Sequence, residues 1–248
     1  MKIEPKIGII YFHQGWTDII NSLSLLNYYK NKYFLLYLFI RADSKPLIEY
    51  YIKGINIIPI YIEKEMLDQL DTIDFFNRNI QIKKYDILYH GGLDVFRSDS
   101  YRQKYGKEIN KFFVEDFYTS YDIDYINRIN YFIFDRNYEL ENKEYNKFIN
   151  IYGNKYILSH HILESEIENL NNLPIINLAE KSYILFDYLQ ILINATEIFL
   201  LDSVWGAFIY LLDCKYKLFE NKKITIYCKR GYNKMFTEPI TLNNWIIL

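Results

Sequence analysis

The chain has 248 residues, a length that suits one large domain or two small ones. Half of its residues are hydrophobic and 24% are charged, so it can bury a core and is not an intrinsically disordered chain. It has only 9 Gly and 5 Pro, which excludes collagen-like and linker-like proteins. Because 29 Lys and Arg face 31 Asp and Glu, the chain lacks the basic excess that is typical of nucleic-acid-binding proteins.

The two cysteines, Cys214 and Cys228, are too few for a disulfide framework and lack metal-ligand spacing. We expect them to be reduced thiols in a cytoplasmic protein. Charged residues interrupt the amino terminus at positions 2, 4 and 6, which does not fit a signal peptide. No segment reaches the ~18 uncharged apolar residues of a membrane helix, so we expect no transmembrane segment.

The first third of the chain alternates short apolar runs with helical patterns. Strands are predicted at Lys6–Phe12, Phe34–Ile40, Ile55–Ile62 and Tyr85–Tyr89. Helices are predicted between them, at Thr17–Tyr29, Pro46–Ile52 and residues 64–77. Strands that are apolar on both faces and alternate with helices are typical of a parallel sheet covered by helices.

The last hundred residues resume this alternation after an irregular middle. Strands are predicted at Lys155–Ser159, Pro174–Leu178, Glu197–Leu201 and Lys223–Tyr227. Helices are predicted at Ile184–Ile193 and Val204–Leu212. In the middle, residues 93–150, only Tyr131–Phe134 resembles a strand, and the remainder reads as helices and loops.

The fold class predicted from this pattern is therefore α/β, with two Rossmann-like lobes, parallel sheets and a cleft between them. We place an amino-terminal lobe at residues 1–115, a connecting helical segment at 116–150 and a carboxyl-terminal lobe at 151–248.

All four histidines of the chain fall at the carboxyl end of a predicted strand. They are His13, His90, His160 and His161. Ligands of open α/β sheets bind beyond these strand ends, and histidine changes its charge most easily near neutral pH. We therefore expect a site there, although each histidine taken alone also fits an ordinary polar residue at a strand exit. No two histidines are spaced i, i+4 and no cysteine lies nearby, so we expect no zinc site.

Two junctions of the first lobe carry candidate residues. In the first, Gly15 allows a tight turn, and Thr17 or Asp18 opens a helix as a cap. The alternative is that a carboxylate or imidazole of this junction, Asp18 or His13, serves as a general base. In the second, His90 precedes two glycines, and Arg97 either holds a phosphate or pairs with an acid such as Asp94.

The junction of the second lobe reads Asp202-Ser203-Val204-Trp205-Gly206. It follows a buried strand and opens a helix, whose exposed amides and positive dipole end would favour a phosphate. An ordinary Asp or Ser cap explains the same residues. His160, His161 and Asn177 end neighbouring strands and would face the same crevice.

A family resemblance follows from these motifs. Gly15-Trp16-Thr17-Asp18 before an apolar helix resembles the G-x-x-D opening of heptosyltransferase-like sugar transferases, which usually carry small or aliphatic residues where Trp16 and Thr17 stand. Asp202-Ser203 and three segments before it resemble the donor lobe of small viral and bacterial glycosyltransferases. These segments are Leu173–Leu178, Phe186–Tyr188 and Ile193–Ile198. Such enzymes have the two-lobed GT-B architecture and need neither a bound metal nor another cofactor.

The resemblance implies roles for the candidate residues. Asp18 becomes the candidate catalytic base, with His13 as its rival. The expected donor-binding residues are His160, His161, Asn177, Asp202, Ser203, Val204 and Trp205. The expected acceptor or phosphate contacts are Gly15, Trp16, His90, Asp94 and Arg97.

The function that we expect is transfer of a hexosyl or deoxyhexosyl group from a nucleotide-diphosphate sugar to a hydroxyl of a glycan acceptor, with inversion. Two alternatives remain open at this point. One is a nucleotide-sugar epimerase on the same fold, and the other is a non-catalytic module that binds a glycan or a nucleotide.

Overall fold

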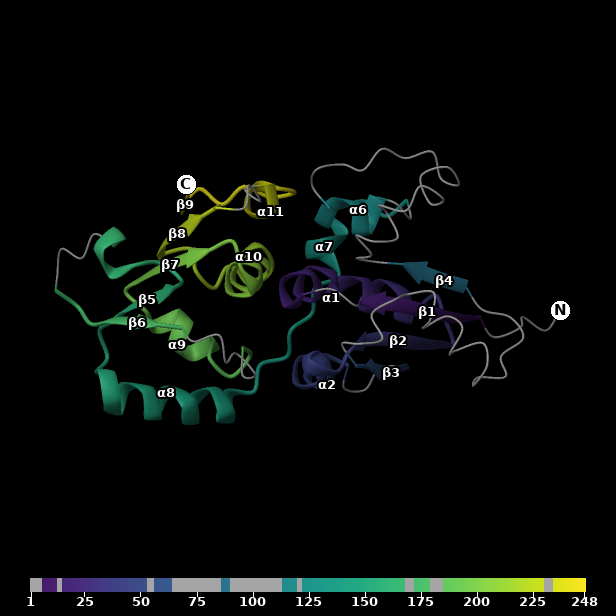
Figure 1. Cartoon of the computed structure of the whole chain (residues 1–248), viewed down its shortest axis with the longest axis horizontal. Helices are drawn as coiled ribbons and strands as arrows, with labels where there is room; N and C mark the ends of the chain where they lie inside the picture. The colour runs from purple at the N-terminus through teal and green to yellow at the C-terminus, as the bar shows by residue number, and fades with distance from the viewer. Residues whose placement is uncertain are drawn as a thin grey trace. The chain divides into compact units, whose positions relative to one another are not determined.

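The computed structural model describes residues 6–12, 15–52, 56–63, 86–89, 113–119, 122–167, 172–178, 185–229 and 234–248 (Figure 1). The chain divides into two compact units, Met1–Ile133 (unit 1) and Phe134–Leu248 (unit 2). The segment that we expected to connect the lobes, residues 116–150, is thereby shared between the two units. Within the described ranges no helix is long and apolar enough to cross a membrane.

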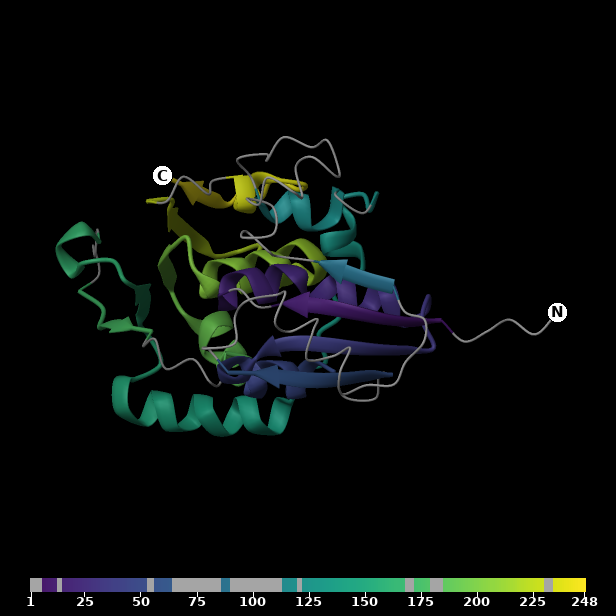
Figure 2. The same cartoon turned by 45° about the vertical axis from the view of Figure 1, so that its right-hand side comes forward.

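Unit 1 contains a four-stranded parallel sheet. Its strands are β1 (Ile7–Phe12), β2 (Leu35–Arg41), β3 (Ile57–Ile62) and β4 (Asp86–Tyr89), and Figure 2 shows them side by side in the order β3-β2-β1-β4. All four confirm strands predicted from apolar runs. The chain runs outward from β1 through β2 to β3 and then returns to the other side of β1, which makes the β1–β4 gap the point where the strand order reverses.

Helices of unit 1 are α1 (Trp16–Lys30), α2 (Lys45–Tyr51), α6 (Phe113–Thr119) and α7 (Asn127–Asn130). Helix α1 packs against β1, β2, α6 and α7, so even its polar residues Asn21, Ser24 and Asn27 are buried. Buried polar groups need hydrogen-bond partners, and distant segments supply them here.

These buried polar side chains fix α1 to the second half of unit 1. Asn21 Oδ1 accepts from the buried Arg128 guanidinium at 2.5 Å, and the Asn21 carbonyl accepts from Tyr118 Oη at 2.6 Å. Ser24 Oγ donates to the Arg128 carbonyl at 2.6 Å, and Asn27 donates to Tyr51 Oη at 2.7 Å. Burial raises the pKa of Tyr118, which keeps its hydroxyl a donor.

Unit 2 contains a five-stranded parallel sheet. Its strands are β5 (Ile157–His160), β6 (Ile175–Asn177), β7 (Glu197–Leu201), β8 (Lys223–Tyr227) and β9 (Trp245–Ile247), in the order β6-β5-β7-β8-β9. The chain moves outward from β5 to β6 and then crosses to β7 on the other side of β5. The strand order of this sheet therefore reverses between β5 and β7.

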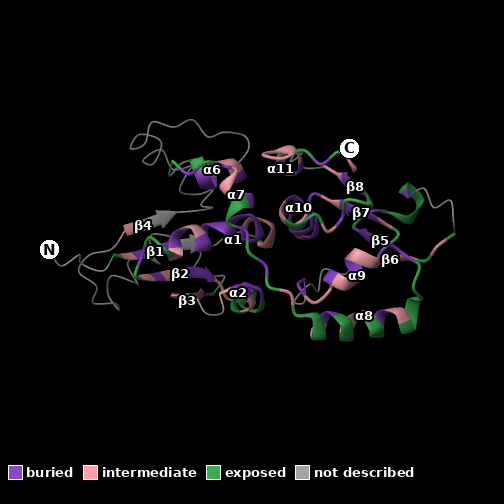
Figure 3. Cartoon of the chain, turned by 180° about the vertical axis from the view of Figure 1, so that it is seen from behind, coloured by how far each residue is buried: buried purple, intermediate pink, exposed green. Residues whose placement is uncertain are grey.

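Helices of unit 2 are α8 (Tyr138–Tyr152), α9 (Leu189–Asn194), α10 (Val204–Tyr216) and α11 (Lys234–Thr237). Every residue of α10 from its second to its eleventh position is buried, whereas α8 buries only Glu141 and Phe148 (Figure 3). The Asp213 carboxylate accepts from the Phe219 amide at 2.8 Å and from Trp245 Nε1 at 3.0 Å, which joins α10 to β9.

Two sequence predictions differ from the structure, and a third lies outside the described residues. Tyr131–Phe134 is not a strand, because it lies in an irregular connection without a sheet partner. The helix predicted at Ile184–Ile193 begins later, at Leu189, after a turn at residues 185–188. The helix predicted at residues 64–77 lies outside the described residues.

Candidate functional site

The reversal point between β5 and β7 defines a candidate site in unit 2. Ligands of open α/β sheets bind beyond the carboxyl ends of the strands at such a point. His160 is the last residue of β5 and lies in register with Leu200 of β7, two residues before Asp202 and three before Ser203. The sheet therefore brings the ends of two predicted motifs together, although they are about 40 residues apart in sequence.

His160 is a buried residue at this edge, with 4% of its surface exposed. Its ring lies 4.1 Å, centroid to centroid, from the ring of His161, which is exposed and has a left-handed backbone (φ 58°). Burial, and then the adjacent His161, lowers the pKa of His160 to about 4. The His160 imidazole is therefore neutral at physiological pH.

The β7–α10 junction lies on the other side of the reversal point. The Asp202 amide donates to the Tyr227 carbonyl at 3.2 Å, which fixes this turn to β8. Ser203 occupies the position before α10 in an extended conformation, and its carbonyl accepts from the Ala207 amide at 3.0 Å. Its side chain makes no capping hydrogen bond to the helix. The amides of the first turn of α10 have no acceptor within the helix, as at every helix start.

His160 Nδ1, Ser203 Oγ and Trp205 Nε1 are buried polar atoms near this junction that lack a hydrogen-bond partner among the described residues. The great majority of buried polar side-chain atoms in folded proteins are paired, so such a group calls for a bound molecule or another explanation. The Ser203 hydroxyl can donate and the Trp205 N–H can only donate, and both residues belong to the start of α10, where the positive end of the helix dipole favours an anion.

Cys228, at the end of β8, is a further residue of this edge that the sequence did not single out. Burial and then the Asp202 carboxylate raise the pKa of its thiol to about 11, so the thiol stays protonated. Neither cysteine forms a disulfide bond, and Cys214 lies inside the core whereas Cys228 is half-buried. The register of β7 with β8 could have revealed the proximity of Cys228 to Asp202, but pairing order is not readable from the sequence.

The sequence led us to expect that Asn177 faces the same crevice as His160, and the structure corrects this. Asn177 ends β6 with an exposed side chain and pairs in register with Ser159, so it lies on the sheet face opposite to His160. A Cβ atom on Gly206 would come within 3.1 Å of the Phe236 ring and 3.3 Å of the Leu201 carbonyl. The small size of Gly206 thus permits packing inside unit 2.

Unit 1 carries the candidate residues Gly15, Trp16 and Asp18 where β1 leads into α1, beside its own reversal point. Gly15 precedes α1, and its carbonyl accepts from the amides of Asp18 (3.0 Å) and Ile19 (3.1 Å). Asp18 and Trp16 are half-buried in the first turn of α1, where the helix dipole favours a carboxylate. The predicted residues His13, His90, Asp94 and Arg97 lie outside the described residues.

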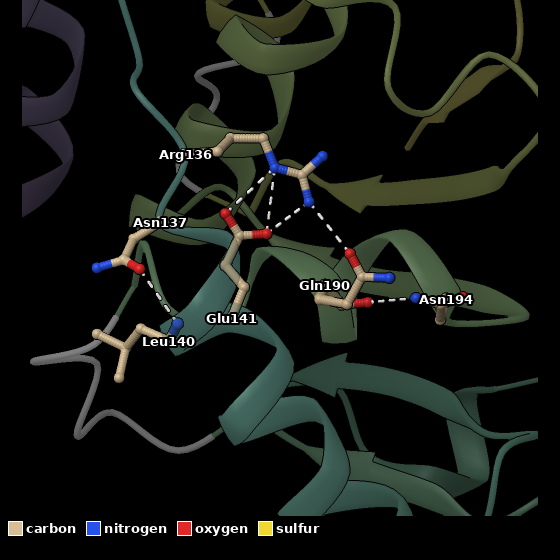
Figure 4. A network of polar contacts seen from close by, with 6 residues as sticks. All are labelled: Arg136, Asn137, Leu140, Glu141, Gln190 and Asn194. Carbon is tan, nitrogen blue, oxygen red and sulfur yellow. Dashed lines mark hydrogen bonds and ion pairs between the residues drawn. The ribbon is translucent and has the colours of Figure 1, made fainter.

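A second polar network, not predicted from the sequence, holds the start of unit 2 (Figure 4). Arg136 contacts both carboxylate oxygens of Glu141, at 2.5 Å from Nη2 and 3.1 Å from Nε, and donates to Gln190 at 3.1 Å. Asn137 Oδ1 accepts from the Leu140 amide at 3.1 Å and so caps α8. This network is structural, because Glu141 is only 1% exposed and Arg136 links Glu141 of α8 to Gln190 of α9.

No group of three or more His, Cys, Asp or Glu side chains in the described part of the chain is arranged to hold a metal ion. The candidate site of unit 2 contains polar donors, a helix start, the buried Asp202 carboxylate and a neutral imidazole.

No family model and no curated protein matches the sequence. Three solved structures match nearly the whole chain. "E. coli ADP-heptose lps heptosyltransferase II" matches with a TM-score of 0.55 at 12% identity, over 98% of this chain and 90% of that one. A "glycosyl transferase family 9" protein from Veillonella parvula DSM 2008 matches with a TM-score of 0.53 at 10% identity, over 100% and 87%.

"E. coli heptosyltransferase WaaC with ADP" matches with a TM-score of 0.50 at 11% identity, over 97% of this chain and 92% of that one. These matches confirm the resemblance and the fold class predicted from the sequence. The chain has the GT-B fold, the two-unit α/β architecture of these glycosyltransferase structures.

Proposed function

We propose that the chain is a glycosyltransferase that transfers a sugar from a nucleotide-diphosphate sugar to a hydroxyl of a glycan acceptor, with inversion at the anomeric carbon. The observation that carries the proposal is the group of unpaired buried polar atoms at the start of α10, where the strand order of unit 2 reverses. The fold match supports it, because one matched structure is a heptosyltransferase with ADP.

In this proposal the diphosphate of the donor binds at the start of α10. The amides of the first turn, Ser203 Oγ and Trp205 Nε1 donate hydrogen bonds to its oxygens. These donors are fixed before the reaction, so they stabilise the negative charge that grows on the leaving group without reorganising. The proposal needs no metal ion, since the helix start and these donors perform this task.

Asp18 is the proposed base. Its carboxylate takes the proton of the acceptor hydroxyl as the acceptor oxygen forms a bond to the anomeric carbon. The bond between that carbon and the diphosphate oxygen breaks at the same time, and its electron pair leaves with the nucleoside diphosphate. Asp18 lies in the first turn of α1, the helix that follows β1, where the resemblance to heptosyltransferases places the base.

The other sequence predictions for the reaction stay proposals. His13 is the alternative base, and Gly15, Trp16 and His90 are proposed acceptor or phosphate contacts together with Asp94 and Arg97. The proposed transferred group is a hexosyl or deoxyhexosyl group. ADP-heptose should be included in a screen of donors because one matched structure is an ADP-heptose heptosyltransferase.

A thermal-shift screen against ADP, UDP, GDP and TDP tests the first step. A ligand present at a hundredfold excess over its Kd stabilises the native state by about 2.7 kcal/mol, which is readily detected. We expect one nucleotide to raise the melting temperature and the others to have little effect. A flat response to all four would contradict the proposal.

The variant Asp18→Ala tests the chemical step. With the matching nucleotide sugar, we expect release of the nucleoside diphosphate to fall by at least about 100-fold, as for loss of a general base, while binding of the diphosphate is retained. Asp43→Ala removes an exposed carboxylate of the same unit, which pairs with Arg41, and serves as the control. Unchanged turnover in Asp18→Ala would discard this assignment. An altered sugar formed from donor alone would indicate an epimerase.

A further inference from the structure

The unpaired nitrogen of His160 differs in chemistry from the other unpaired atoms of the site. Ser203 Oγ and Trp205 Nε1 adjoin the helix start, where donors and the dipole together suit an anion. His160 ends the neighbouring strand, in register with Leu200, three residues before Ser203, so it lies one strand away from the strand that leads into α10.

The environment of His160 does not suit an anion. Its side chain is buried and lies beside the imidazole of His161, with ring centroids 4.1 Å apart. Both effects lower its pKa to about 4, so the ring carries no charge that would attract a phosphate. A neutral imidazole has one donor nitrogen and one acceptor nitrogen.

A hydroxyl group can pair with His160 Nδ1 in either tautomer, because it both donates and accepts. Phosphate oxygens of a diphosphate only accept, and they would favour the charged imidazole that this environment opposes. We propose that His160 binds an uncharged hydroxyl group of the donor, on its ribose or on its sugar, while the diphosphate lies at the start of α10. This assignment rests on the proposed function of the same site and deepens it.

In this assignment different residues bind two parts of the donor. The start of α10 binds the charged diphosphate, and His160 binds an uncharged hydroxyl group. His160 then selects for a ligand whose hydroxyl lies at a fixed distance from its diphosphate. Inorganic pyrophosphate carries neither a ribose nor a sugar. It therefore binds only at the start of α10 and makes no hydrogen bond to His160.

Isothermal titration calorimetry with three probes tests this division. The probes are inorganic pyrophosphate, the nucleoside diphosphate that stabilises the chain, and the corresponding nucleotide sugar. They are compared in the wild type, in His160→Phe and in Ser203→Ala. His161→Asn is the matched control, because it alters the exposed neighbour and Asn tolerates the left-handed backbone there.

We expect Ser203→Ala to weaken all three probes. We expect His160→Phe to leave pyrophosphate unchanged and to weaken a hydroxyl-bearing probe by about tenfold, the size of one hydrogen bond. A loss already present with the nucleoside diphosphate assigns the ribose, and a loss only with the nucleotide sugar assigns the sugar. His160→Asn, which retains a polar atom near the position of Nδ1, should recover part of the affinity.

Equal weakening of pyrophosphate by His160→Phe would overturn the assignment, and so would unchanged affinity for all three probes. If the wild type binds none of the probes, the proposed function fails and this assignment fails with it. Melting curves of each variant verify folding, and His160→Leu provides a second apolar replacement if the Phe ring is not accommodated.

Discussion

Burial of a neutral His160 makes the stability of unit 2 depend on pH. The pKa of this imidazole is about 4 in the folded chain against 6.5 for an ordinary histidine. Between these values the unfolded chain binds a proton that the folded chain does not bind. The free energy of unfolding therefore rises as pH rises through this window, and it is lost as pH falls from about 6.5 toward about 4.

The size of the effect follows from the same two values. At about pH 8 both states are neutral, whereas at about pH 5 most unfolded molecules carry the proton and most folded ones do not. The difference in unfolding free energy between these two conditions is about 2 kcal/mol. Since only 4% of His160 is exposed, little of this is lost to solvent screening.

The assay compares the wild type with His160→Gln, whose side chain does not titrate. Urea unfolding is followed by tryptophan fluorescence in a Trp16→Phe background, so that the two remaining tryptophans, Trp205 and Trp245, report on unit 2 alone. We expect the stability difference between wild type and variant to shift by about 2 kcal/mol, against the wild type, between about pH 8 and about pH 5.

Leu158→Val is the control for this comparison. It alters a fully buried residue of β5 on the same sheet face as His160 and contains no titrating group, so its effect should not depend on pH. A His160→Gln difference that stays constant within about 0.5 kcal/mol over this pH range would refute the reasoning.

Two further substitutions test the packing that positions the site. Glu141→Ala leaves the Arg136 charge without its carboxylate and should lower the free energy of unfolding in urea by about 3 kcal/mol. The control Glu139→Ala changes an exposed residue of the same helical turn and should lower it by less than about 1 kcal/mol. Similar losses in the two variants would contradict the structural role of the Arg136–Glu141 pair. Gly206→Ala places a methyl group 3.1 Å from a phenyl ring and should cost about 1–3 kcal/mol. Gly15→Ala meets nothing closer than 3.9 Å and should cost less than about 1 kcal/mol, so an equal loss in both would show that crowding is not the cause.

The sheet cores were predictable because their strands are apolar runs bounded by polar residues. Strand β9 (Trp245–Ile247) was missed because three residues carry too little periodicity, and its place beside β8 is fixed by long-range contacts such as that of Trp245 with Asp213. Tyr131–Phe134 is the opposite case, because its sequence has the apolar pattern of a strand but the segment forms none. Phe132 and Phe134 are buried by packing in a connection that forms no strand.

The strand ends and the helix start that form the candidate site were predictable from the sequence, but the burial that keeps His160 uncharged was not. Strand ends and helix starts can be located from sequence, which placed His160 and Ser203 at the edge where they are found. Burial of His160 depends on register, and register depends on all the strands of the sheet together. The Arg128–Asn21 hydrogen bond joins residues 107 positions apart, a pairing that no local pattern indicates.

Hydrogen–deuterium exchange with and without the nucleoside diphosphate tests the central claim most directly. If the diphosphate binds at the start of α10, the amides of Val204, Trp205 and Gly206 gain an acceptor and should exchange more slowly when the ligand is present. Ser203→Ala should reduce this protection. Protection confined to unit 1, or unchanged exchange at the start of α10 under saturating ligand, would contradict the account.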